Sequence, residues 1–209
     1  MTSGKYRHRI HSNVTLCLSL ITLFCIATSS VEARTYPKKS WQTRRPQEVG
    51  LNPQKIDAIA ELLAGRGRIV KGGYVVKSWE DQSEKGGWMS SSKPVISTLL
   101  FFALQEGKLD SVHTPIERFG WDLSAKDKQM TFHHLANMIS GYARPDKPGA
   151  AWAYNDYAVN LYRLTLFDRL FGADPDTVAN DPRRLGALQF EDGLSFSKKA
   201  HVVASVRDF

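Results

Sequence analysis

Apolar residues recur at helical spacing, at positions i, i+3, i+4 and i+7, in several stretches of the chain. Each of the first three stretches begins at or just after an asparagine, serine or threonine, residues that commonly cap the start of a helix. Each is followed by a glycine, which is typical of a helix end. The predicted helices begin after Asn52, at Ser90, after Thr131 and at about Asp156, and they end near Gly65, Gly107, Gly141 and Phe171. The apolar positions are Ile56, Ile59, Ala60, Leu63, Ile96, Leu99, Leu100, Ala103, Phe132, Leu135, Ala136 and Ile139.

Between the first two predicted helices, residues 68–79 show the pattern of a β-hairpin. β-Formers flank Gly72-Gly73, a pair that tolerates the positive φ angles of a two-residue turn. Beyond Gly172 the chain is polar, and no element is predicted there with comparable support.

Residues 1–33 have the pattern of a secretory signal peptide. Lys5, Arg7 and Arg9 precede a mostly apolar stretch at 14–27, and Val31-Glu32-Ala33 supplies small residues at the −3 and −1 positions of a cleavage site. The apolar stretch is shorter than the roughly 20 residues that span a bilayer. We therefore predict an exported protein, in the periplasm or outside the cell, that begins at Arg34 and keeps no stable membrane span after cleavage.

Cleavage would change the composition. The 209-residue chain has a formal net charge of +7, and loss of three basic residues and one acidic residue lowers it to +5. Cys17 and Cys25 would both leave, which excludes a disulfide and thiol chemistry in the remaining chain. The basic residues are scattered rather than interleaved with aromatics, so nucleic acid is not an expected partner. Residues 34–46 are expected to form a polar basic arm, and residues 47–209 the folded domain.

The candidate chemistry centres on Ser90-Ser91-Ser92-Lys93. Only Ser90 lies three residues before Lys93, a spacing that places two side chains on one helix face. A serine hydroxyl needs a base within hydrogen-bond reach, and a lysine can serve when burial and nearby positive charge favour its neutral form. A helix N-terminus also offers a backbone N–H for a developing oxyanion. The alternative is an ordinary serine cap followed by a surface lysine.

Several further segments follow this motif in a characteristic order. They are Glu106-Gly107-Lys108-Leu109-Asp110, Pro115-Ile116, the run from Thr131 to Tyr142 that contains Ser140-Gly141, and Trp152-Ala153-Tyr154-Asn155-Asp156. In this order the segments resemble the serine β-lactamase-related family, which includes class C β-lactamases, D-alanyl-D-alanine carboxypeptidases and esterases. The resemblance covers roughly residues 47–170. It implies an α+β fold of the β-lactamase/transpeptidase type, with an antiparallel sheet flanked by helices, of which this chain holds the N-terminal portion.

The resemblance also implies roles for individual residues. Ser90 matches the acylated nucleophile, Lys93 its base partner, and Tyr154 the tyrosine that helps move the proton to the leaving group. Asp156 stands where the family usually has asparagine, and an ionised aspartate cannot donate a hydrogen bond to a substrate carbonyl. Trp152, next to Tyr154, is the tryptophan expected to contact substrate. Core packing of the tyrosine and helix capping by Asp156 are the alternatives without the family context.

The third family motif, a Lys-Thr-Gly or His-x-Gly strand after the tyrosine, is not found. Lys71-Gly72-Gly73 precedes the nucleophile, and Lys147-Pro148-Gly149 precedes Tyr154. We therefore expect the chain to end inside the domain, at what looks like the capped start of a helix at Ser205. A hairpin edge would then lack partners, and the helices around Leu99, Leu135 and Leu161 would expose apolar faces. Such a chain is expected to be poorly soluble and to turn over nitrocefin and p-nitrophenyl esters no faster than a Ser90→Ala variant.

The function expected from these observations is acyl transfer to Ser90 followed by hydrolysis of an amide, a β-lactam or an ester. The substrate would be a small molecule or a cell-wall peptide. The alternative is a non-catalytic remnant or a cell-wall-binding module. No cofactor is expected. The adjacent His133 and His134 are not expected to bind a metal, because they point about 100° apart on a helix and no carboxylate or third histidine stands at ligand spacing.

Overall fold

The computed structural model describes residues 35–37 and 40–208. The predicted signal peptide at 1–33 and its cleavage site lie outside these residues. The chain divides into two units, Met1–Tyr36 and Pro37–Phe209, and the second contains every element described below.

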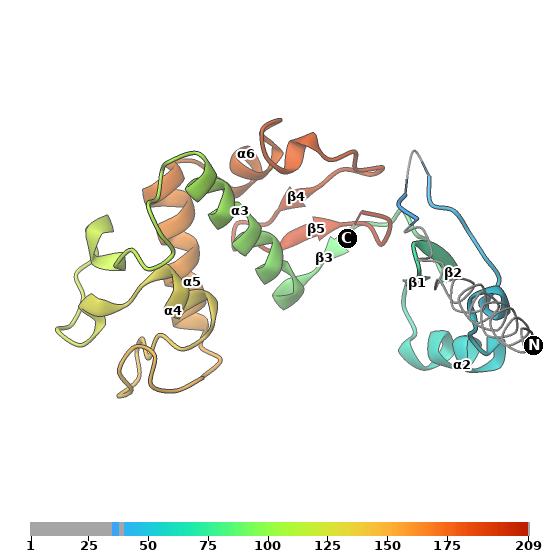
Figure 1. Ribbon diagram of the computed structural model, residues 1–209, viewed down its shortest axis with the longest axis horizontal. Coiled ribbons are helices and arrows are strands. Elements are labelled where there is room, and N and C mark those ends of the chain that lie inside the picture. Colours follow the sequence, from blue (N-terminus) through green and yellow to red (C-terminus); the bar gives the residue numbers. More distant parts are fainter. Residues whose placement is uncertain (1–34, 38–39, 209) are drawn as a thin grey trace, which may run out of the picture. The chain divides into compact units, whose positions relative to one another are not determined.

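The described part of the chain is a mixed α+β structure with five α-helices and two small antiparallel sheets (Figure 1). The helices are α2 (Pro53–Leu63), α3 (Lys93–Gln105), α4 (Phe132–Ala136), α5 (Asp156–Leu164) and α6 (Pro175–Asn180). The strands are β1 (Gly67–Lys71), β2 (Tyr74–Trp79), β3 (Gly86–Gly87), β4 (Ser195–Phe196) and β5 (Val202–Ala204). Short 3₁₀-helices are η1 (Pro46–Val49), η2 (Met89–Ser92), η3 (Ile116–Phe119), η4 (Asp127–Gln129) and η6 (Leu185–Ala187), and η5 (Thr165–Phe171) is π-helical.

The first predicted helix and the hairpin are confirmed, but of the predicted apolar face of the helix only Ile56 and Ala60 are buried, whereas Ile59 and Leu63 are exposed. The side chain of Asn52 accepts a hydrogen bond from the backbone N–H of Lys55 at 3.0 Å and so caps α2. β1 and β2 pair antiparallel with Lys71 opposite Tyr74, and the two turn residues Gly72 and Gly73 adopt φ angles of 59° and 84°. Two successive positive φ angles match the twist of the flanking strands, which explains the glycine pair.

The edge of β2 is partly covered. Val75 donates its backbone N–H to the carbonyl of Gln42 and accepts from the N–H of Arg44, at 2.9 and 3.0 Å. Thr43 thereby forms a parallel bridge with Val75. Thus part of the predicted arm, residues 42–44, occupies the hairpin edge that we expected to lack a partner.

The second sheet has the strand order β3-β5-β4 and lies beside α3 (Figure 1). Gly86 pairs with Ala204, and Ser195 pairs with Val203. β5 therefore joins a strand that precedes the serine motif to a strand near residue 195. This sheet was not predicted, because its strands are only two or three residues long.

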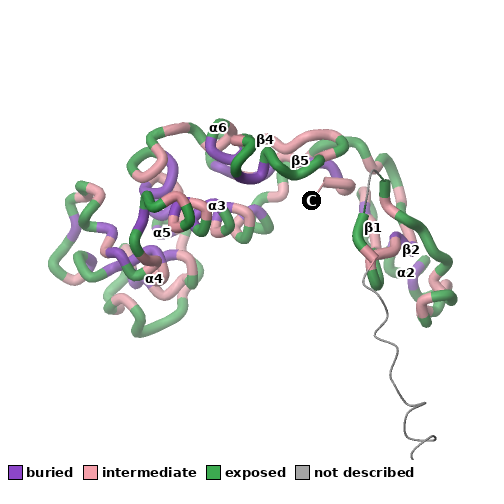
Figure 2. Tube along the Cα trace, turned by 45° about the horizontal axis from the view of Figure 1, so that its top comes forward, coloured by how far each residue is buried: buried purple, intermediate pink, exposed green. Residues whose placement is uncertain are grey.

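The helices α3, α4 and α5 form one core with the segment after Gly172, and α2 contributes no residue to it. Leu99, Leu135 and Leu161 are each 5% exposed or less, so the expectation that their apolar faces would lie open is wrong. The same core includes apolar residues of α6, β4 and β5, and the trace has buried stretches near α6 and β4 (Figure 2). The buried members contributed by the late segment are Val178, Ala179, Leu185, Phe196, Ala200, Val202 and Ala204.

The helix predicted after Thr131 is shorter than expected. Thr131 caps it as predicted, but α4 ends at Ala136 because Met138 adopts a φ of 59°, which no α-helix accommodates. Ile139 therefore lies outside the helix. The last predicted helix is confirmed over 156–171 as α5 followed by η5, and Gly172 ends it with a φ of 65°.

No helix among the described residues is both long enough and apolar enough to cross a membrane.

Candidate active site

Three of the predicted site residues meet at one hydroxyl group. Ser90 Oγ lies 2.7 Å from Tyr154 OH, and Lys93 Nζ donates a hydrogen bond to the same oxygen, also at 2.7 Å. The ammonium group also lies 4.8 Å from the centre of the Tyr154 ring, within the range of a cation–π contact. Tyr154 therefore stands between the serine and the lysine, which lie 64 and 61 positions before it in the sequence.

The local backbone brings Ser90 and Lys93 to the same side. Ser90 lies in the 3₁₀ turn η2, and α3 begins only at Lys93, so the expectation that Ser90 itself opens the α-helix is wrong. In a 3₁₀ turn, side chains at i and i+3 eclipse each other. The spacing argument for Ser90 therefore holds although the turn is of a different type. Pro94 favours the start of the α-helix at this point, because backbone N–H groups in the first turn of a helix have no partner within the helix and the N–H that proline lacks is not needed there.

Tyr154 is held at the end of a long loop. Its neighbour Ala153 donates its backbone N–H to the carbonyl of Met138 at 2.8 Å. On the other side, Asn155 caps α5 by accepting from the N–H groups of Tyr157 and Ala158, and its amide nitrogen donates to the carbonyl of Tyr142. The residue after the tyrosine thus anchors both the helix start and the loop.

The environment of Tyr154 favours its phenolate form. The hydrogen bond from Lys93 is the largest cause that lowers the pKa of Tyr154 below its ordinary value of 10.0, and the hydrogen bond with Ser90 lowers it further. Partial burial and the negative charge of Asp156 act in the opposite direction. A tyrosine with a lowered pKa beside a serine hydroxyl is a suitable proton acceptor.

These residues line a cavity of about 530 Å³. Such a volume suits a small-molecule ligand or the end of a peptide. The lining residues are Met89, Ser90, Lys93, Tyr154, Asp156, Val159, Asn160, Arg163, Lys199 and His201.

The two predicted substrate-binding residues differ in placement. Asp156 is the first residue of α5 and lines the cavity with Ser90 and Tyr154. The α5 cap is Asn155, so Asp156 is free of the capping role that was its alternative. Trp152 is 69% exposed, and the cavity lining does not include it.

Lys199 and His201 were missed by the sequence analysis. They lie on the connection between β4 and β5, in the polar stretch for which no element was predicted. The turn is closed by hydrogen bonds from Ala200 and His201 to Ser197, and Ala200 adopts a φ of 55°. The one feature of the sequence that could have pointed to these two residues was the run of β-forming residues after His201, which is typical of a strand.

Hydrogen bonds tie this late strand to the serine motif. Val202 donates its backbone N–H to the hydroxyl of the fully buried Ser92 at 2.8 Å. Trp88 donates its backbone N–H to the carbonyl of Val202 and its indole N–H to the carbonyl of Ala204, at 2.9 and 3.0 Å. The wall that carries His201 is therefore fixed to both ends of η2.

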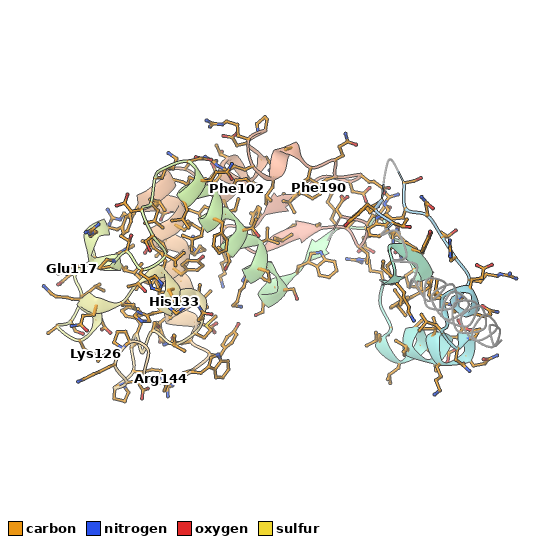
Figure 3. The ribbon with its side chains drawn as sticks, viewed as in Figure 1. Phe102, Glu117, Lys126, His133, Arg144 and Phe190 are labelled. Carbon is orange, nitrogen blue, oxygen red and sulfur yellow. The ribbon has the colours of Figure 1, made fainter. Side chains whose placement is uncertain are left out.

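The adjacent histidines His133 and His134 contact other side chains and the backbone near the start of α4. The ring of His133, on α4 in Figure 3, lies 4.9 Å from that of His113 and 5.8 Å from that of His134, measured between ring centres. His134 Nδ1 accepts a hydrogen bond from the backbone N–H of Thr131 at 3.2 Å. Within the described residues, no group of three or more histidine, cysteine or acidic side chains is arranged to hold a metal ion.

Compared with known proteins, the chain matches no family model, and a search of curated proteins finds no significant match.

Proposed function

We propose that this chain is an exported serine hydrolase related to the β-lactamase family, in which Ser90 is the nucleophile for acyl transfer. The observation that carries the proposal is the convergence of Ser90 Oγ and Lys93 Nζ on Tyr154 OH, each at 2.7 Å. The cavity beside these atoms leaves room for a substrate. An activated serine within reach of a base is the minimal apparatus of covalent acyl transfer.

The arrangement supports a different catalytic role for each of Ser90, Tyr154 and Lys93. The Tyr154 phenolate accepts the Ser90 proton as Oγ attacks the substrate carbonyl, and it returns that proton to the leaving group when the tetrahedral intermediate collapses. Water then attacks the acyl-serine ester, with Tyr154 again accepting a proton, and Ser90 leaves as the restored hydroxyl. Lys93 acts through Tyr154, since its positive charge stabilises the phenolate. This assigns the role of immediate base to Tyr154, whereas the family resemblance of the motifs implied Lys93 as the base partner.

The substrate classes that remain are amides, β-lactams and esters. Lys93, Arg163 and Lys199 give the cavity a positive excess over Asp156. Acylation of Ser90 is the step tested first, because the later hydrolysis of the acyl-enzyme is a separate reaction with its own rate.

The test is covalent labelling. The full chain is incubated with a fluorophosphonate, and in parallel with a penicillin, and the adduct is located by peptide mass spectrometry. We expect a single adduct on Ser90, its loss in Ser90→Ala and its retention in Ser91→Ala, because Ser91 is exposed and has no such partner. Tyr154→Phe removes both hydrogen bonds and should slow labelling by at least about 10²-fold.

Two outcomes would contradict the proposal. Labelling that persists in Ser90→Ala would show that another residue is the nucleophile. A folded chain that binds cell-wall peptides without forming any adduct would instead favour a non-catalytic binding module.

A further inference from the structure

Met89 is an exposed methionine directly beside the proposed nucleophile. It directly precedes Ser90, lines the same cavity and is 61% exposed. The other methionines of the described residues differ, since Met130 is fully buried and Met138 is partly buried. Among the methionines that the structure describes, Met89 is therefore the most exposed to a reagent in solution.

The backbone at Met89 is strained. Its φ of 43° lies in the left-handed region, which is uncommon for a residue other than glycine. On one side, Trp88 is held to β5 by its backbone and indole hydrogen bonds; on the other, η2 places Ser90 beside Tyr154. Strained residues persist where the surrounding contacts over-determine them. A change in the Met89 side chain therefore acts next to a tightly positioned reacting oxygen.

We propose that Met89 is an oxidative modification site, and that its conversion to the sulfoxide by a peroxide slows acylation of Ser90. In this step the thioether sulfur takes one oxygen atom from hydrogen peroxide. The O–O bond breaks, an S–O bond forms, the sulfur loses two electrons and water is released. The sulfoxide replaces an apolar part of the cavity wall with a polar, chiral group. Methionine sulfoxide reductases reverse the change with thiol reductants.

The inference rests on the proposed function, because the effect is measured at Ser90. A small displacement of a reacting group can cost about 10²-fold in rate. We therefore expect complete oxidation of Met89 to lower the rate of fluorophosphonate labelling by at least about tenfold.

The experiment treats the full chain with hydrogen peroxide for increasing times. Peptide mass spectrometry follows the gain of one oxygen at Met89, Met130 and Met138, and the labelling rate of Ser90 is measured at each time. Met89→Leu removes the sulfur at the proposed site, and Met138→Leu is the matched control. Each protein is compared with its own untreated sample, so that differences in starting rate do not matter.

We expect Met89 to be oxidised first, with the labelling rate falling in step in the wild type and in Met138→Leu. Met89→Leu should keep its untreated rate, and incubation of oxidised wild type with reductases for both sulfoxide epimers should restore mass and rate together. An equal loss of rate in Met89→Leu, or oxidation of Met89 without any loss, would overturn the inference while leaving Ser90 as nucleophile. Absence of labelling in the untreated protein would instead reject the proposed function, and the switch with it.

Discussion

The hydroxyl of Ser92 accepts a hydrogen bond from the backbone N–H of Val202 at 2.8 Å, across 110 positions of sequence. The three serines before Lys93 therefore differ in environment. Ser90 meets Tyr154, Ser91 is exposed, and Ser92 is fully buried against β5. This contact links the serine motif to the strand that follows His201.

Replacement of Ser92 by alanine should destabilise the protein. The variant leaves the Val202 N–H buried without its acceptor, which typically costs about 1–3 kcal/mol. Ser91→Ala is the matched control and should change the free energy of unfolding by less than about 0.5 kcal/mol. Urea unfolding of both variants measures the difference. Equal midpoints for the two variants would show that the Ser92 contact contributes nothing.

The labelling rate of Ser90 should rise with pH through the lowered pKa of Tyr154. Lys93 lowers this pKa by stabilising the phenolate, so the base form becomes populated below the ordinary value of 10.0. Lys93→Met removes the largest cause of the shift, and the inflection of the pH–rate profile should move to higher pH. Fluorophosphonate labelling between pH 6 and pH 10.5 measures both profiles. An inflection at the same pH in both proteins would mean that another group controls the rate.

Acidification should weaken the fold through His134. Burial is the main cause that lowers the pKa of His134 below 6.5, and His133 and His113 lower it further. Below about pH 6.5 the unfolded chain binds a proton that the folded protein resists, so stability falls as the pH drops from 6.5 towards the folded pKa. Protonation would also remove the acceptor that Nδ1 offers to the Thr131 N–H.

His134→Gln tests this contribution, because glutamine at the third helical position can still complete a capping box but does not titrate. The difference in Tm between pH 7.5 and pH 5.0 should be smaller in this variant than in the wild type. His201→Gln, outside the histidine cluster, is the control and should keep the wild-type difference. A full difference in His134→Gln would assign the acid sensitivity to other groups.

Two glycines with similar backbone angles should respond differently to substitution. Gly141 and Gly172 have φ angles of 60° and 65°, but a Cβ atom at Gly141 would lie 2.1 Å from the carbonyl oxygen of Asp146, whereas at Gly172 it would meet nothing within 4 Å. Gly172→Ala should therefore cost about 1 kcal/mol for the backbone angle alone. Gly141→Ala should cost at least about 1 kcal/mol more, because the backbone must move.

Chemical denaturation of the two alanine variants checks this comparison. Gly141 also begins the loop that leads to Tyr154, so Gly141→Ala should slow labelling of Ser90 while Gly172→Ala should not. Similar losses of stability in the two variants would indicate that the 141–146 loop adapts to the added methyl group.

The elements predicted correctly are those whose signals are local. The Asn52-Pro53 start of α2 and the Gly72-Gly73 turn depend on residues within one turn of each other. The early end of α4 was missed because a positive φ at Met138 has no sequence signature. Local signals therefore predicted most of the helices, and the end at Phe171, but they placed the end of α4 too late.

The site was predictable only in part for a similar reason. Ser90, Lys93 and Tyr154 carry chemistry in their side chains, and their motifs made them candidates before any geometry was known. Lys199 and His201 reach the cavity because a three-residue strand pairs with residues more than a hundred positions earlier. Neither periodicity nor a motif encodes such a pairing, so only the folded structure identifies these two residues.

The hydrogen bond between Ser92 and Val202 also limits how early the site can form during synthesis of the chain. A contact across 110 positions closes only after the intervening chain has been made, which takes roughly 5–20 s at ordinary rates of synthesis. The helices that contain local contacts can form well before that time. The nucleophile segment therefore acquires its final position at a late stage, and a ribosome-bound chain that ends before residue 202 is expected to hold Ser90 without the wall that His201 provides.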